Sequence, residues 1–263
     1  MTVETPQFIK VGAGTDAREI AYRIAEPAPG SKLPQLVWLG GYRSDMRGTK
    51  AVELEAHAKS LGAGCLRLDY SGHGESGGDF MDGCISRWLE DALAVIRQVG
   101  AERLVLVGSS MGGWIALRAL QELLKAGGPQ KVVGMLLIAP APDFTQELME
   151  PELTDKERDS MAARGYFEEP SQYSDEPNIY TRLLMEDGKQ NLVLSGIIDT
   201  GCAVHIVQGM QDPDVPYTHA LKLLDHLPAD DVVLTMVRDG DHRLSRAQDI
   251  ALLKRAAEGL LTA

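Results

Sequence analysis

The sequence predicts an α/β fold in which a doubly wound, mostly parallel eight-stranded sheet carries helices on both faces. Eight apolar runs of strand length recur along the chain, and longer amphipathic stretches separate most of them. Later runs such as 104–107 and 132–138 are continuously apolar rather than alternating, which is typical of parallel strands that are covered on both faces. Because the first strands follow one another without a helix, we expect the sheet to begin with antiparallel strands.

The elements follow this rhythm in order. After the opening strands, each strand of the first half leads into an amphipathic stretch of helix length, and two further strand-helix pairs close the chain. The expected strands are 8–11, 19–25, 35–39, 64–69, 103–107, 132–138, 203–208 and 232–237. The expected helices are 49–61, 84–98, 112–126, 217–227 and 245–261.

One segment, about 141–195, interrupts the alternation. It contains no strand-like run, and 13 acidic against five basic residues between 143 and 189 give it a net charge of −8. Since its apolar residues are unlike those of a linker, we expect a helical lid that covers a site within a single domain of residues 1–263. A peripheral helical pair that merely packs on the domain is the alternative. Candidate contacts to a substrate are Met149, Tyr166, Phe167, Tyr173 and Leu184.

The strongest functional signal is Gly-x-Ser-x-Gly with Ser110 at its centre. The motif stands between the apolar strand 103–107 and a helix rich in small residues. A serine on such a sharp strand-to-helix turn takes a strained backbone conformation, and the flanking glycines avoid side-chain clashes. We therefore expect Ser110 to be a nucleophile, with the backbone N–H of Met111 free to donate to an oxyanion.

A serine nucleophile needs a base, and the base needs an orienting carboxylate. In the chain order Ser…Asp…His, the acid follows the strand 203–208 and the base follows the strand 232–237. These places are occupied by Asp212 and His242. Asp214 is the rival carboxylate, but its place before Val215 and Pro216 is more typical of a turn that begins a helix.

The loop after the third strand is the expected source of the second oxyanion donor. Gly40 and Gly41 allow close backbone approach there, and the N–H of Tyr42 is our candidate. A second glycine-rich segment, 69–78, lacks the Lys-Ser/Thr pair of a phosphate-binding loop and is interpreted as a structural turn.

Composition narrows the possible partners. The formal net charge of −12 and the absence of a basic patch argue against nucleic acid. No apolar run approaches the length of a membrane span, and the first residues do not form a targeting segment. Cys65, Cys84 and Cys202 suggest neither a disulfide framework nor a metal site, so we expect reduced thiols and a cytoplasmic protein.

The elbow, the acid turn, the histidine turn and the oxyanion loop together resemble the α/β-hydrolase superfamily over nearly the whole chain. Several segments also resemble the mitochondrial members of that family that remove S-acyl groups from proteins and cleave acyl glucuronides. They are 41–46 with 48–51, 69–72, 108–114, 170–174 and 241–243. The resemblance implies a Ser110–Asp212–His242 triad acting on fatty-acyl thioesters or acyl glucuronides, in a relative of bacterial type.

These observations predict a serine carboxylesterase or thioesterase that uses neither metal nor organic cofactor. Its expected substrates are small-molecule or lipid-acyl esters and thioesters, including S-acylated proteins. One rival is cofactor-free perhydrolase chemistry on the same triad. Another is a small-ligand-binding protein on a hydrolase scaffold, which would be expected to have a damaged triad. Ser110 excludes an aspartate-nucleophile dehalogenase or epoxide hydrolase.

Overall fold

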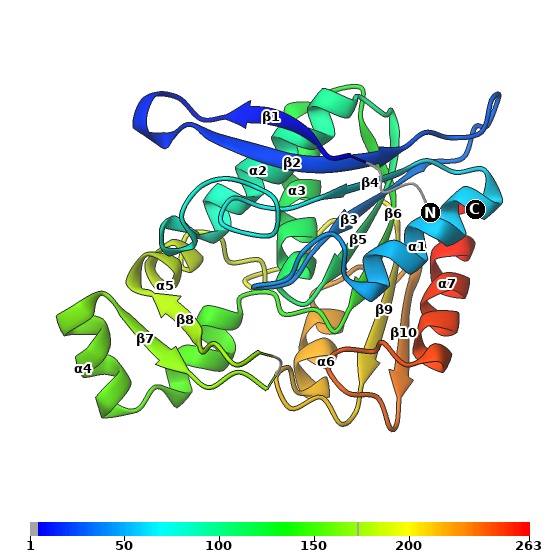
Figure 1. Ribbon diagram of the computed structural model, residues 1–263. Helices are drawn as coiled ribbons and strands as arrows, with labels where there is room; N and C mark the ends of the chain where they lie inside the picture. Colours follow the sequence, from blue (N-terminus) through cyan, green and yellow to red (C-terminus); the bar gives the residue numbers. More distant parts are fainter. Residues whose placement is uncertain (1–4, 173) are drawn as a thin grey trace.

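The computed structural model describes residues 5–172 and 174–263 and contains an eight-stranded sheet (Figure 1). The strand order is β1-β2-β4-β3-β5-β6-β9-β10. β2 pairs antiparallel with both β1 and β4, and all other neighbours pair parallel. The strands are β1 (Gln7–Val11), β2 (Arg18–Ala25), β3 (Gln35–Leu39), β4 (Cys65–Leu68), β5 (Arg103–Ser109), β6 (Lys131–Ile138), β9 (Ala203–Gly209) and β10 (Val232–Val237).

Helices cover both faces of this sheet. Alternate residues of β5 enter two different apolar clusters: Leu104 and Leu106 join one, and Val105 and Val107 join the other. The first cluster contains residues of α2 (Ile85–Val99), α3 (Met111–Ala126) and α6 (Tyr217–Asp225), and the second contains residues of α1 (Thr49–Leu61) and α7 (Ala247–Leu261). Burial on both faces explains why residues 36–39 of β3 and 104–107 of β5 are continuously apolar. The predicted doubly wound sheet is confirmed, with element ends shifted by a residue or two.

The segment after β6 corrects one expectation. We expected no strand there, but β7 (Tyr166–Glu169) and β8 (Asn178–Thr181) form a separate two-stranded antiparallel sheet. Each strand has four residues, and β7 ends in two glutamates, so its composition carries little strand signal. The hairpin lies between α4 (Asp155–Arg164) and α5 (Arg182–Gly188), and these elements project to one side of the main sheet (Figure 1). Short helical turns cover Gly14–Asp16, Phe80–Asp82, Thr145–Met149 and Glu150–Glu152.

Local sequence explains where the helices of this segment begin. The Thr154 hydroxyl accepts from the Glu157 N–H while the Glu157 carboxylate accepts from the Thr154 N–H, which is a capping box at the start of α4. Thr181 caps α5 by accepting from the Leu184 N–H at 3.1 Å. Throughout the described ranges, the helices are too short or too polar to span a bilayer.

Candidate active site

Ser110 stands on a strained turn between β5 and α3. Its φ of 55° and ψ of −121° lie in a region that residues with side chains rarely adopt. The motif glycines permit this geometry because backbone atoms pack so closely around them that a Cβ would not fit. A Cβ on Gly108 would stand 2.4 Å from the carbonyl oxygen of Gly112, and one on Gly112 would stand 2.1 Å from that of Leu39. The sequence pattern is therefore a steric requirement of the turn.

A continuous hydrogen-bond chain connects the three predicted residues. The Ser110 Oγ lies 3.1 Å from Nε2 of His242, and Nδ1 of the same ring lies 2.8 Å from Oδ2 of Asp212. Each residue follows the carboxyl end of a parallel strand, β5, β9 or β10, so all three meet at one edge of the sheet. The His242 side chain is 15% exposed and the Asp212 side chain is 0% exposed. Solvent therefore reaches the base but not the acid.

The structure distinguishes the two candidate carboxylates. Oδ1 of Asp212 accepts from the backbone N–H groups of Asp214 and Val215 at 2.9 and 2.8 Å, and its Oδ2 accepts from Nε2 of Gln208 at 3.1 Å. These donors hold the Asp212 carboxylate against the histidine ring. Asp214 is exposed and contributes to this arrangement through its backbone N–H.

The loop after β3 passes close to Ser110. A Cβ on Gly41 would stand 3.2 Å from the Ser109 carbonyl oxygen and 3.3 Å from the Ser110 Cβ, which explains the requirement for glycine. Within the described ranges, the backbone N–H groups of Tyr42 and Met111 have no hydrogen-bond acceptor. Two such donors beside a candidate nucleophile suit an oxygen that gains negative charge.

The Tyr42 side chain connects this loop to β8. Its ring stacks on Tyr180 with centroids 5.2 Å apart, and its hydroxyl donates to the Ile179 carbonyl. Burial raises the pKa of this phenol well above its ordinary value, and neighbouring Tyr180 adds to the effect. The hydroxyl therefore stays protonated and remains a donor. Beside it, the Arg43 guanidinium donates to the Pro177 carbonyl and to Glu176.

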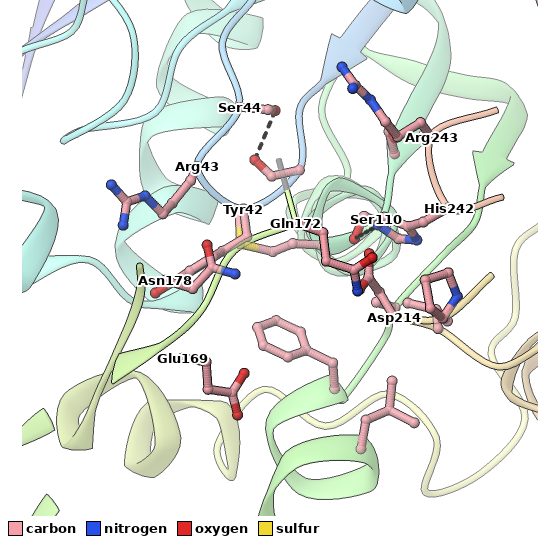
Figure 2. A pocket seen from close by; sticks show the side chains of 18 of the residues that line it. Tyr42, Arg43, Ser44, Ser110, Glu169, Gln172, Asn178, Asp214, His242 and Arg243 are labelled. Atoms are coloured by element: carbon pink, nitrogen blue, oxygen red, sulfur yellow. Dashed lines mark hydrogen bonds between the residues drawn. The ribbon is translucent and has the colours of Figure 1, made fainter. Parts of the chain in front are cut away.

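A cavity of about 740 Å³ opens over Ser110 (Figure 2). One part of its wall is apolar and comes largely from the 141–195 segment: Phe144, Leu148, Met149, Leu153 and Tyr180. Charged residues also line it, five acidic and three basic among the described residues. They are Asp45, Glu152, Glu157, Glu169 and Asp214, and Arg43, Lys50 and Arg243.

Five residues were candidate contacts to a substrate, and among the described ones the structure places one, Met149, in the wall of this cavity. Phe167 and Leu184 are each 1% exposed and belong to packed interiors, and Tyr166 contacts the Arg164 guanidinium instead. The fifth, Tyr173, lies outside the described residues. The local sequence shows that these side chains are apolar but not whether they face the cavity or the segment's own interior.

Lys50 is a lining residue that sequence reasoning missed. It lies in α1, and its Nζ donates to the Arg243 carbonyl at 2.6 Å, beside His242. Burial, together with the nearby Arg243 charge, lowers the pKa of Lys50 to about 8. A lysine in the first turn of a helix carries no local signal, because only the tertiary approach of α1 to the loop after β10 places it there.

In the described part of the chain, one group of side chains has the spacing of metal ligands: Asp212, Asp214 and His242. His242 and Asp212 are hydrogen-bonded to each other in this group, and the other ring nitrogen faces Ser110. Because both ring nitrogens are already engaged, the arrangement fits a proton-transfer chain better than a metal centre.

Fold and site together define a class of protein, and comparison with known sequences agrees. The model of the alpha/beta hydrolase family matches residues 33–252. The chain therefore belongs to the α/β-hydrolase family and is a hydrolase.

Individual proteins are also similar to this chain in sequence and in structure. The mitochondrial palmitoyl-protein thioesterase ABHD10 of mouse is 34% identical over 227 residues, which cover 84% of this chain and 73% of that protein. A crystal structure of a putative hydrolase from Agrobacterium vitis S4 is 62% identical, with a TM-score of 0.95 over 98% of both chains. The structure of the mouse protein superposes with a TM-score of 0.85 at 29% identity and covers 98% of this chain and 99% of that one.

Proposed function

We propose that this protein is a serine hydrolase that cleaves carboxylic esters and acyl thioesters through an acyl-enzyme on Ser110. The observation that carries the proposal is the hydrogen-bond chain from Ser110 through His242 to Asp212, with distances of 3.1 and 2.8 Å. A ligand-binding protein on the same scaffold has no need of this complete chain. The relatives named thioesterases support the same class of reaction.

In the proposed reaction, the Ser110 Oγ attacks the acyl carbonyl carbon while Nε2 of His242 takes the hydroxyl proton. Asp212 holds the Nδ1–H tautomer of the ring and stabilises the imidazolium. The N–H groups of Tyr42 and Met111 donate to the oxyanion. Collapse of the tetrahedral intermediate breaks the bond to the leaving group, which receives the proton from His242. Water, deprotonated by the same histidine, then attacks the acyl-enzyme; the bond to Ser110 Oγ breaks, His242 returns the proton to that oxygen, and the acid is released.

This proton path suggests how a substrate lies in the cavity. The leaving group must be near Nε2 of His242, the side that Lys50 and Arg243 also line. The acyl group then extends toward the apolar wall of Phe144, Leu148 and related residues. Burying an acyl chain there contributes about 0.8 kcal/mol per methylene. We infer that fatty-acyl thioesters, including S-acylated proteins, are suitable substrates.

A fluorophosphonate probe tests the nucleophile directly, because it phosphonylates an activated serine. We expect stoichiometric labelling of Ser110, with S110A losing both labelling and turnover by a factor on the order of 10⁴ or more. Ser245 is a matched control, since it also lines the cavity but its hydroxyl donates to the Arg243 carbonyl. S245A should label normally. Labelling that persists in S110A would show that another residue is the nucleophile.

A further inference from the structure

The turn that contains the Tyr42 donor is closed by Ser44. The Gly41 carbonyl accepts from the Ser44 N–H at 3.2 Å. It also accepts from the Ser44 hydroxyl at 3.0 Å, the bond dashed in Figure 2. A trans peptide is planar, so its C=O and N–H point in opposite directions. Two donors on the Gly41 oxygen therefore also fix the direction of the Tyr42 N–H, which belongs to the same peptide unit.

The next peptide unit is held from outside the turn. The Arg43 N–H donates to Nε2 of His73 at 3.2 Å, and Arg43 has a φ of 53°. Nδ1 of His73 lies 3.1 Å from the Ser71 carbonyl oxygen. A carbonyl only accepts, so Nδ1 carries the proton and Nε2 is the lone-pair acceptor that the Arg43 N–H requires. Burial lowers the pKa of His73 to about 4, which preserves this neutral form.

The support behind His73 is rigid. Its ring packs against Tyr70, Phe80 and Trp88 with centroids 5.2 to 5.7 Å apart. Its own segment, the glycine-rich turn 69–78, also holds the far end of the oxyanion loop, since Oδ1 of Asp69 accepts from the Met46 N–H at 2.6 Å. The glycine-rich turn thus contacts the oxyanion loop at two backbone donors.

We propose that Ser44 and His73 are positioning residues of the oxyanion hole, holding the peptide units on either side of Tyr42 so that its N–H points at the reacting oxygen. The inference rests on the proposed serine-hydrolase function. Neither side chain needs to touch the substrate, because each acts on the backbone that carries the donor. Such support matters since a donor must be held within about 0.5 Å of its productive position.

Two pairs of variants test this. S44A removes the hydroxyl at an exposed position and leaves the backbone turn bond, while S44T retains the hydroxyl. H73L removes the acceptor at similar volume, while H73Q can place an amide oxygen near the position of Nε2. Ser60 is the matched control, because its hydroxyl also donates to the carbonyl three residues earlier, that of His57 at 2.7 Å, on α1.

Removing a whole oxyanion donor lowers kcat by about 10²–10³. For a misaimed donor we expect S44A and H73L to lose about 10-fold or more in kcat, with KM for the same ester within about 2-fold. A boronic-acid inhibitor, which forms a tetrahedral adduct with the serine, should weaken in parallel with kcat. S44T and H73Q should recover most of the loss, and S60A should match the unmodified protein.

If the unmodified enzyme is labelled and active, an unchanged kcat in S44A would overturn the positioning role but not the proposed function. A rise in KM equal to the loss in kcat/KM would also overturn it, because that pattern describes general damage to the cavity. If H73L does not fold, S44A and S44T still decide the question. An unmodified protein that neither labels nor hydrolyses any ester refutes the function itself and is thus a separate result.

Discussion

Replacing Asp212 with asparagine tests the assignment of the acid most sharply, because the structure dictates how the amide must sit. The backbone N–H groups of Asp214 and Val215 both need an acceptor at the Oδ1 position. Oδ2 has one side-chain donor, Nε2 of Gln208, which also donates to the Gly209 and Val215 carbonyls. With two backbone donors on Oδ1 against this one, the amide nitrogen of D212N should take the Oδ2 position, facing Nδ1 of His242. Since that nitrogen donates, the ring must accept at Nδ1 and carry its proton on Nε2. In this tautomer His242 cannot remove the Ser110 proton.

The expected loss is large. The same substitution in a comparable triad costs roughly 10⁴-fold in kcat, which is roughly 5 kcal/mol of transition-state stabilisation. The assay compares kcat for a chromogenic short-chain ester in D212N and D214N, with thermal melting as a check on folding. Asp214 is exposed, and D214N retains the backbone N–H that donates to Asp212, so D214N should lose less than about 10-fold. A greater loss in D214N than in D212N would refute the assignment.

Three further predictions follow from the cavity and its support. Tyr42→Phe keeps the backbone N–H but removes the hydroxyl that donates to the Ile179 carbonyl. Urea unfolding should show a free energy of unfolding lower by about 1 kcal/mol, and kcat/KM should fall. An unchanged free energy of unfolding would show that this contact is not stabilising. Five acids against three bases line the cavity, so an acyl-coenzyme A should have a lower kcat/KM than a neutral thioester of the same chain, and added salt should narrow the gap; a salt-independent preference for the coenzyme A ester would contradict this. For His73, the fall in unfolding free energy from pH 7.5 to pH 5 should be larger in the unmodified protein than in H73Q. The histidine takes up a proton below about 6.5 when unfolded but only near pH 4 when folded, so its contribution falls by about 2 kcal/mol on acidification, and parallel pH curves for the two proteins would argue against it.

The sheet and the hydrogen-bond chain could be read from the sequence because both depend on local patterns. Residues 104–107 of β5 are buried on both faces of the sheet and are therefore apolar at every position. The turn at Ser110 requires glycines for steric reasons that any chain in this conformation shares. Asp212 lies three residues after the end of β9, and His242 lies five residues after the end of β10. What the local pattern did not contain is strand order, for example that β4 lies between β2 and β3.

The wall of the cavity was less predictable because it depends on packing between distant segments. Phe167 and Tyr180 come from the two strands of the small sheet, and both are aromatic. Phe167 is 1% exposed and buried in packing, while Tyr180 lines the cavity. Periodicity over four-residue strands is too short to separate these cases. Likewise, the partner of Lys50 is the Arg243 carbonyl, which is far away in sequence.

Tyr42 has two roles that the structure places in one residue. In the proposed reaction its N–H donates to the oxyanion, and its phenol donates to the Ile179 carbonyl in β8. The neighbouring Arg43 repeats this division, since its backbone N–H donates to His73 and its guanidinium to Pro177 and Glu176. The turn therefore stands between the rigid 69–78 segment on one side and the 141–195 segment on the other. A displacement of β8 away from the cavity must break the Tyr42 and Arg43 side-chain contacts, whereas the Ser44 and His73 bonds can persist. We therefore expect two separable properties: the Tyr42 and Arg43 side chains hold the 176–179 stretch beside the cavity, and the backbone bonds hold the proposed oxyanion donor.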